Sequence, residues 1–370
     1  MIFKGMHGIS ARSRGIERTR PALTPTAAWP QIATMYFYGL AGDPSDFDPL
    51  ALLLAALLLD AVIGEAVLLF RRVPHPVAAI GRLVAFLERK LNRDQRSAAD
   101  RMWRGAFTVL LVTGLCVAVG WGIAWSSRKH MAGQVVELLL LTFLIAQRSL
   151  FDHVRAVGVA LRSDGLIAAR RAVAHIVGRD PHKLDRHAVA RAAIESCAEN
   201  FSDGVVAPVF WYVLFGLPGI LAYKAVNTMD SMIGHLSPRY RAFGMVAARL
   251  DDVMNLIPAR LAALLIALAA LFLPGGKPGA AVATVWRDAR RHRSPNAGWP
   301  EAAMAGALGL ALAGPRQYAD GPVMDAWMGR GRPQATPEDI RRSLYILAIA
   351  CLIITLAVAA TIAAQIQAGS

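Results

Sequence analysis

The sequence predicts an all-α integral membrane protein, namely a polytopic helix bundle with broken or re-entrant helices and amphipathic surface helices. The first observation is a hydrophobic content of 55% over 370 residues, with a mean hydropathy of +0.41. The second is the uncharged run 344–366, which at about 1.5 Å per helical residue is long enough to cross a hydrocarbon core of roughly 30 Å. The third is that other apolar runs are interrupted by Gly and Pro, which favours helix breaks.

The N-terminal part differs in composition from the remainder. Up to about residue 34 it carries five basic residues against one acid, Glu17, and it lacks the apolar stretch of a signal peptide. We therefore expect residues 1–48 to be a disordered basic N-terminal extension and residues 49–370 to form a single integral-membrane domain.

Three spans and one amphipathic helix are expected in the first half of this domain. The first span carries Asp60 and Glu65 near its end, and carboxylates inside a membrane are costly enough to be functional candidates. The amphipathic stretch has apolar residues at helical spacing and charges on the other side, as in helices at a membrane surface or against a partner helix. In order, these elements are the span 50–70, the amphipathic helix 77–91, the span 106–125 and the span from about 135 to 150.

The net charge of +14 is explained by membrane topology. The basic residues lie between apolar segments, and no zinc-finger, RNP or basic-helix pattern occurs, so we expect no nucleic-acid partner. The connection 71–104 carries nine Lys and Arg residues and the connection 127–134 only two, which places the former in the cytoplasm. We therefore expect a multi-pass protein of the cytoplasmic (inner) membrane.

The polar stretch 178–235 is the unusual part of this apolar chain. Asp180-Pro181 separates two polar helices, and the second, about 185–200, places Glu195 and Glu199 four residues apart on one face. The apolar run 205–226 that follows is interrupted at 216–219 by Gly-Leu-Pro-Gly. A re-entrant hairpin is the preferred interpretation, with a kinked span as the alternative, and the hairpin would return residues 227–235 to the side of Glu199 and Asp203.

The last third of the chain alternates apolar and polar segments. Small side chains in one run would let helices approach closely within a bundle. The expected segments are a short apolar run 261–273, a basic segment 287–298, the small-residue run 302–314, a Gly- and Pro-rich loop 314–337 and the final span 344–366.

Carboxylates and carboxamides in the polar segments are candidates for a site. Such oxygen ligands hold Mg²⁺ together with nucleotide phosphates, and nearby Arg and Lys can bind phosphates or carboxylates. An ion-pair network that holds loops at the membrane surface is the alternative for any single residue. No GxxxxGK[ST], GxSxG or HExxH pattern occurs, which argues against a Walker site, a nucleophile-elbow hydrolase and a zincin.

Several long strings resemble the CobD/CbiB family of cobalamin biosynthesis. The match covers roughly residues 50 to 365, with one departure, since the family's Gly-Asp-Pro element after Asp60 is replaced here by Gly64-Glu65-Ala66. The strings that carry it are Val73-Pro74-His75-Pro76-Val77, Gly178-Arg179-Asp180, Ala192 to Ser196, Ala198 to Gly204, Lys224 to Gly234, Arg249 to Asn255 with Pro258-Ala259-Arg260, Arg293 to Gly298 and Pro300 to Leu308.

The resemblance implies an adenosylcobinamide-phosphate synthase, with residues 49–370 as one catalytic domain. Such a ligase joins a carboxylate of adenosylcobyric acid, a corrinoid, to aminopropanol phosphate or aminopropanol, using ATP as co-substrate and Mg²⁺. The expected residues are Glu195, Glu199, Asp203 and Asp230 for catalysis, Arg179, Lys224, Asn200, Asn227, Arg249 and Arg293 for binding ATP or substrate, with Asn255 as a further orienting amide, and Glu199, Asp203, Asp251 and Asp252 for the metal.

Two other classes of function stay open at this point. One is a membrane phosphotransferase, although the alcohol phosphotransferase spacing is not met. The other is a transporter or sensor, but a transporter would carry its acids near the bilayer midplane, whereas most acids here fall in polar segments. The active site is expected to face the cytoplasm. Membrane lipid is an expected partner, and association as a homo-oligomer or with other corrinoid-pathway proteins is left open.

Overall fold

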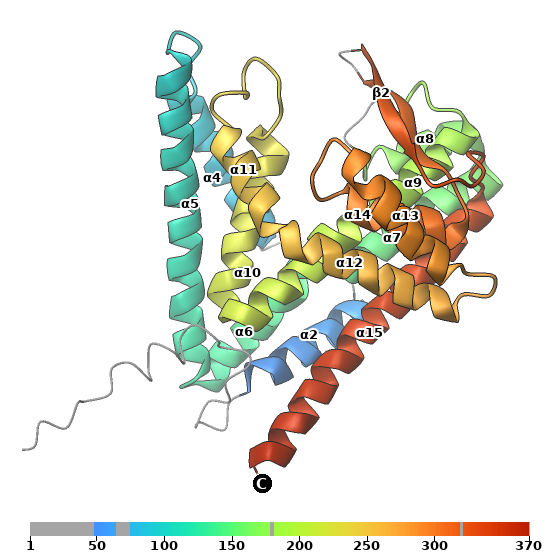
Figure 1. Cartoon of the computed structure of the whole chain (residues 1–370). Coiled ribbons are helices and arrows are strands. Elements are labelled where there is room, and N and C mark those ends of the chain that lie inside the picture. Colours follow the sequence, from blue (N-terminus) through green and yellow to red (C-terminus); the bar gives the residue numbers. More distant parts are fainter. Residues whose placement is uncertain (1–47, 64–74, 178–180, 319–320, 370) are drawn as a thin grey trace, which may run out of the picture.

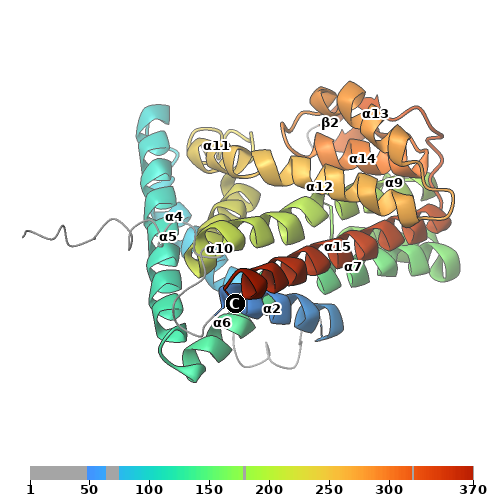
Figure 2. The same ribbon diagram turned by 60° about the horizontal axis from the view of Figure 1, so that its bottom comes forward.

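The computed structural model describes residues 48–63, 75–177, 181–318 and 321–369, and these residues form a helical bundle with one small β-hairpin (Figure 1). The expected extension, apart from Asp48, therefore lies outside the described residues, as do Glu65 and Arg179. In both views α5 lies at one side of the molecule and α13 at the opposite side, with α10 between them (Figures 1 and 2).

The first half of the described chain is entirely helical. Its elements are α2 (Pro49–Ile63), α4 (Pro76–Leu91), α5 (Ala98–Ser127), α6 (Met131–Leu144), α7 (Gln147–Val159), the π-helical turn η1 (Ala160–Asp164), α8 (Gly165–Val173) and α9 (Arg186–Phe201).

The second half adds the hairpin. Its elements are the π-helical turn η2 (Ser202–Val206), α10 (Ala207–Ile233), α11 (Met245–Met254), α12 (Leu256–Ala269), the 3₁₀ turn η3 (Ala270–Phe272), α13 (Pro278–Asp288), the 3₁₀ turn η4 (Ala289–Arg291), α14 (Gly298–Leu308), the antiparallel strands β1 (Leu312–Tyr318) and β2 (Gly321–Met328), and α15 (Pro337–Gly369).

Local chemistry explains where key helices begin. The side chain of Asp185 accepts a hydrogen bond of 2.7 Å from the Ala188 N–H and so caps α9. Asp60, a predicted intramembrane carboxylate, caps α7 from a distance, because its Oδ2 accepts the Gln147 N–H at 2.9 Å. A buried carboxylate at a helix N-terminus satisfies amides that the helix leaves unpaired, so the structure gives Asp60 a role in packing.

Two large hydrophobic cores hold the bundle together, and a third, small cluster lies at the β-hairpin. The larger surrounds α9, which contributes a continuous set of buried side chains, and it includes residues of α2, α7, α12, α14 and α15. The smaller is built by α4, α5, α11 and the second half of α10, with Val84, Val226, Met229 and Phe243 fully buried. Helix α10 thus links the two cores.

A backbone break divides α10 at Gly216. Its φ of 63° and ψ of −154° lie in a region that only glycine adopts easily, and Pro218 follows two residues later. Helix α5 presses on this break through Gly120, because a Cβ there would lie 2.8 Å from the Pro218 Cα. The segments before and after Gly216 run in different directions (Figure 1).

The expected membrane character is confirmed. Among the described residues, four helical runs are long and apolar enough to cross a membrane, and a fifth if the bent pair α11–α12 counts as one span. Helix α5 and helix α15 match the expected spans, and α4 matches the expected amphipathic helix.

Two boundary predictions need correction, and a third stays a prediction. The third span does not reach residue 150, because α6 ends at Leu144 and α7 begins at Gln147. The predicted end of the first span at residue 70 is untested, because α2 is described to Ile63 and residues 64–70 lie outside the described chain. The expected loop 314–337 contains most of a β-hairpin. The alternation of apolar and polar residues that marks a regular strand could not predict this pairing. The strand register is irregular between Ala313 and Pro315, and Gly314 has a left-handed backbone.

Candidate functional site

The break in α10 brings two distant polar segments together. The Tyr223 hydroxyl lies 3.1 Å from the backbone carbonyl oxygen of Asp203, twenty residues earlier in the chain. A continuous helix would separate two such residues by about 30 Å, so the chain has reversed its direction at Gly216. The expected hairpin shape is confirmed, and the second half of α10 lies beside the π-helical turn η2.

A hydrogen-bonded network then joins α10 to α11. The Tyr223 hydroxyl lies 3.0 Å from Asn255 Oδ1, and the Asn255 Nδ2 donates to Asp251 Oδ2 at 2.9 Å. Asp251 also accepts a hydrogen bond from Asn227 Nδ2, at 3.3 Å, on its other oxygen. Two of the three predicted orienting amides, Asn227 and Asn255, therefore hold one buried carboxylate, whereas the third, Asn200, is hydrogen-bonded within its own helix.

Further charged groups surround this network. Lys224, which is only 8% exposed, interacts electrostatically with Asp203, and Asp203 also interacts with Glu199 and Asp251. Asp230 interacts with Asp252 and Glu199. The carboxylates expected from three separate segments thus lie in one neighbourhood, with a buried lysine among them.

The basic segment after α13 approaches the same neighbourhood. Asn296 Nδ2 donates to the Asp252 carbonyl oxygen at 2.7 Å, and Asn296 Oδ1 accepts from Arg260 Nη1 at 2.8 Å. Arg293, three residues before Asn296, and Arg249, which interacts electrostatically with Asp252, are both exposed. One expected cation, Arg249, therefore lies at the edge of the acidic cluster, and another, Arg293, lies on the segment that Asn296 joins to α11.

Two predicted residues make contacts elsewhere. Glu195 is buried, and its Oε1 accepts the Ala313 N–H of the β-hairpin at 2.7 Å. Asn200 donates to the carbonyl oxygen and hydroxyl of Ser196 on its own helix, both at 2.9 Å. Glu195 and Glu199 lie one helical turn apart, but Glu195 contacts the β-hairpin and Glu199 interacts with Asp203. A catalytic role for Glu195 stays a prediction.

The hairpin that Glu195 holds is also held from α13. Asp288 Oδ2 accepts the Gly329 N–H at 2.9 Å and pairs with Arg287 at 2.6 Å. Burial raises the pKa of Asp288, but the hydrogen bonds from Arg287 and Gly329 outweigh it and leave this pKa below its ordinary value. The same contacts raise the pKa of Arg287.

Sequence reasoning missed two residues of the network. Tyr223 is fully buried and joins Asp203 to Asn255, yet it stands inside an apolar run where an aromatic residue is ordinary core. Its position directly before Lys224 was the available signal. Asn296 belongs to the string Arg293 to Gly298, but its contact with α11 cannot be predicted without the tertiary fold.

The carboxylates do not form a complete metal site by themselves. Among the described residues, no group of three or more His, Cys, Asp or Glu side chains could hold a metal ion. Mg²⁺ in nucleotide sites is usually held by one or two carboxylates together with phosphates and water. The donor set therefore fits an Mg²⁺ ion that arrives with a nucleotide and does not fit a metal ion held by protein ligands alone.

The chain is similar to proteins of known family. A family model described as CobD/Cbib protein matches residues 53–347. A protein named "Cobalamin biosynthesis protein CobD" from Brucella suis biovar 1 is 49% identical over 304 residues, covering 80% of this chain and 92% of that protein. Proteins of the same name from Rhizobium meliloti and Rhodobacter capsulatus are 49% and 46% identical, covering 84% and 80% of this chain and 96% and 92% of those proteins. No solved structure matches the chain.

Proposed function

The chain belongs to the CobD/CbiB family, and from this premise we propose that it is an ATP-dependent ligase that joins adenosylcobyric acid to aminopropanol phosphate or aminopropanol. The product would be adenosylcobinamide phosphate or adenosylcobinamide. The membership makes it a membrane protein of cobalamin biosynthesis. The reaction and its substrates are the proposal.

The proposed chemistry requires activation of a carboxylate. An ionised carboxylate is a poor electrophile, so one of its oxygens first attacks the γ-phosphorus of ATP, which gives an acyl phosphate and releases ADP. The amine nitrogen then attacks the acyl carbon, phosphate leaves, and the nitrogen loses a proton to a base. The site must therefore hold a nucleotide, stabilise a phosphoryl group in transfer and accept one proton.

The residues at the site can fill these tasks. Lys224 is buried beside Asp203 and would stabilise negative charge on the transferred phosphoryl group. Arg249, at the edge of the acidic cluster, and Arg293, on the segment that Asn296 joins to α11, are exposed and would bind phosphate or carboxylate groups of the substrates. Asp230 or Glu199 would accept the proton of the amine.

Carboxylate pairs around Asp251 would hold the ion that accompanies the nucleotide. Asp251 interacts electrostatically with Asp230 and Asp252, and Asn227 and Asn255 keep it oriented. Mg²⁺, when bound with ATP, would neutralise phosphate charge and polarise the γ-phosphoryl group. Carboxylates that bind a metal ion are usually held in orientation by hydrogen bonds from neighbouring residues, and the two amides would do this for Asp251.

The observation that carries the proposal is the joining of η2, α10 and α11 by the network around Tyr223 and Asp251. This network brings acidic side chains and a buried lysine together next to apolar helices. Such a position suits a site that acts on a large amphiphilic substrate. The nine basic residues of 71–104 support a cytoplasmic position for the site, in a cytoplasmic membrane.

The decisive experiment uses the purified full chain in detergent. It is given ATP, Mg²⁺ and adenosylcobyric acid with each amine in turn, and the corrinoid and nucleotide products are followed by mass spectrometry. We expect amide product together with one ADP per amide. Lys224→Met should lose this activity, whereas Lys90→Met, at an exposed position on α4, should keep it. If a folded protein forms no amide with either amine, the proposal is wrong.

The same assay separates the alternatives. A phosphotransferase would transfer phosphate to aminopropanol and leave the corrinoid unchanged. A transporter in vesicles would move the corrinoid or the amine across the membrane without forming ADP in proportion to a new amide. Either result would replace the ligase proposal.

A further inference from the structure

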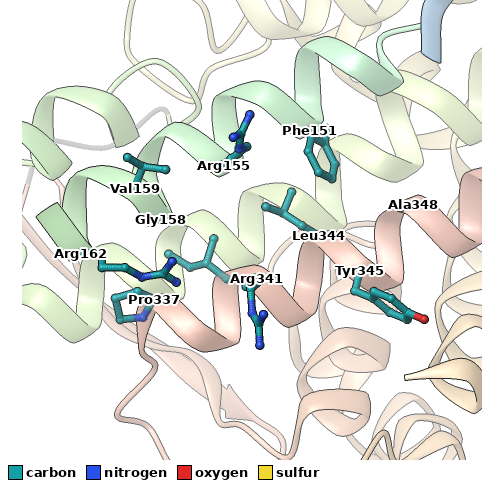
Figure 3. A pocket seen from close by; sticks show the side chains of 11 residues that line it. Phe151, Arg155, Gly158, Val159, Arg162, Pro337, Arg341, Leu344, Tyr345 and Ala348 are labelled. Carbon is teal, nitrogen blue, oxygen red and sulfur yellow. The ribbon is translucent and has the colours of Figure 1, made fainter. Parts of the chain in front are cut away.

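A cavity with no lining residue from the acidic cluster lies between α7 and α15. It has a volume of about 420 Å³, and none of its eleven lining residues is acidic. Three are arginines, Arg155 from α7, Arg162 from η1 and Arg341 from the first turns of α15. Most of the other lining side chains are apolar, so the cavity combines an apolar wall with a cationic rim (Figure 3).

The arginines differ in how they are paired. Arg341 forms an ion pair of 2.6 Å with Glu338 on its own helix. Arg155 and Arg162 are exposed, and the described residues offer them no hydrogen-bond or ion-pair partner. In Figure 3 Arg162 extends toward Pro337, whereas the ends of Arg155 and Arg341 point outward on either side of the cavity. Two unpaired cations therefore border an apolar hollow that contains no anion of the protein.

The apolar wall continues along α15. A second hollow of about 350 Å³ shares Phe151 and Ala348 with the first and extends along α15 as far as Thr355, with α2 on its other side. Leu347 and Leu352 of α15 and Leu57 and Leu58 of α2 line it. The two hollows together form a groove, here called the α7–α15 groove. Three arginines line its first part, and its second part is mainly apolar but is also lined by Gln147 and Arg148.

The position of this groove suits the membrane surface. The candidate span Pro337–Gln367 has 31 residues, about 46 Å of helix, whereas the hydrocarbon core is roughly 30 Å thick. The uncharged part of α15 begins at Leu344, so its charged first turns, which carry Arg341, are the part expected at the level of the headgroups, with the apolar part of the groove running from there into the bilayer. Basic pockets between helices at this level suit anionic headgroups.

We propose that the α7–α15 groove binds one anionic phospholipid. Its phosphate would lie at the cationic rim, where Arg155 and Arg341 would turn from their outward positions to join Arg162, and an acyl chain would lie along α15 past Ala348 toward Thr355. The charge of the rim selects an anionic headgroup, and the length of the apolar wall selects a ligand with a tail. This site is independent of the ligase proposal and does not use its residues.

Binding is tested on the purified full chain in detergent with short-chain phosphatidylglycerol and phosphatidylcholine of equal chain length. We expect phosphatidylglycerol to raise the Tm with increasing concentration and phosphatidylcholine to have little effect, because only a ligand of the folded state raises the Tm. Arg155→Gln and Arg162→Gln should each weaken the apparent affinity about fivefold, from about 1 kcal/mol for each basic residue near an anionic surface. Arg93→Gln, an exposed arginine on the α4–α5 connection, should leave it unchanged.

A second variant tests the shape of the groove. Ala348→Trp adds bulk where the two hollows meet and changes no charge, so it should abolish the response to phosphatidylglycerol. Glycerol phosphate, which has the phosphate without the chains, should raise the Tm far less. An equal response to glycerol phosphate would identify a free-phosphate site. Equal responses to both lipids, or an unchanged response in the two arginine variants, would also refute the proposal.

Discussion

The Tyr223 hydroxyl lies 3.1 Å from the carbonyl oxygen of Asp203 and 3.0 Å from the side-chain oxygen of Asn255. Tyr223 thus connects the turn that ends α9 to the helix that carries Asp251. These segments belong to different parts of the bundle, since Phe201 and Val205 lie in the larger core and Ala247 of α11 lies in the smaller. Tyr223 therefore helps to fix how the two halves of the site face one another.

Removing this hydroxyl should impair the site. In Tyr223→Phe the two oxygens lose a shared donor, and an unsatisfied buried group costs about 1–3 kcal/mol. We expect kcat/KM for amide formation to fall about tenfold, which corresponds to about 1.4 kcal/mol. Steady-state kinetics on the purified variant provide the measurement.

The matched control is the other buried tyrosine of α10. Tyr212 donates to Glu137 Oε1 at 2.8 Å, away from the acidic cluster. Tyr212→Phe should lower the Tm and leave kcat/KM near the wild-type value. If both variants lose only stability, Tyr223 has no positioning role.

Asp251 should be sensitive to loss of its second carboxylate oxygen. Both of its oxygens accept hydrogen bonds from amides, from Asn227 and from Asn255. Asp251→Asn places an NH₂ group against one of these donors and removes a negative charge. A lost buried hydrogen bond costs about 1–3 kcal/mol, so we expect kcat/KM to fall at least tenfold. Asp164→Asn, at an exposed position in η1, is the control. Equal activity in the two variants would remove Asp251 from the site.

The contact of α5 with the α10 break can be tested with two glycines on one helix. A Cβ at Gly120 would lie 2.8 Å from the Pro218 Cα, whereas a Cβ at Gly122 would meet nothing within 4 Å. Both Gly→Ala changes gain about 1 kcal/mol of helix propensity, so their difference reports the contact alone. We expect Gly120→Ala to lower the Tm and the activity, and Gly122→Ala to keep or raise both.

Thermal unfolding followed by tryptophan fluorescence gives the comparison. A Tm for Gly120→Ala at or above that of Gly122→Ala would mean that α5 does not support the break.

Much of the fold could be predicted from the sequence, because apolar segments and helix-breaking Gly and Pro residues determine structure over short stretches of the chain. The spans of α5 and α15, the amphipathic α4 and the reversal at Gly216 follow from apolar length, helical spacing and the Gly-Leu-Pro-Gly interruption. The β-hairpin did not follow. It depends on long-range contacts from Glu195 and Asp288, and these helical carboxylates give no local sign of the strand that they hold.

The candidate site was accessible only in part. Asp203, Lys224, Asn227, Asp230, Asp251 and Asn255 were chosen by residue type, and the structure brings them together. Glu195 satisfied the same pattern but lies on the side of α9 that faces the hairpin. Helical spacing places two residues on one face but does not say which neighbour covers each of them.

Acid should weaken the attachment of the hairpin through Asp288. This carboxylate has a pKa below its ordinary value of 3.8 in the folded protein. A group with a lowered pKa stabilises the fold fully above its unfolded pKa, and the contribution is lost as the pH falls through the folded value. The stabilisation should thus be complete at neutral pH, begin to fall near pH 4 and be lost as the pH falls through the lower pKa of the folded protein.

The measurement is the Tm of the wild type and of Asp288→Asn from pH 7 to pH 3. At neutral pH the variant should be less stable by about 2 kcal/mol, since it loses charged hydrogen bonds to Arg287 and to the Gly329 N–H. The gap should narrow as the pH falls below 4, because the carboxyl of the unfolded wild type then takes up a proton, whereas the folded carboxyl, with its lower pKa, does so only at still lower pH. Asp164→Asn, which removes an exposed carboxylate, should follow the wild type throughout. A gap that stays constant to pH 3 would mean that the charge of Asp288 does not hold the hairpin.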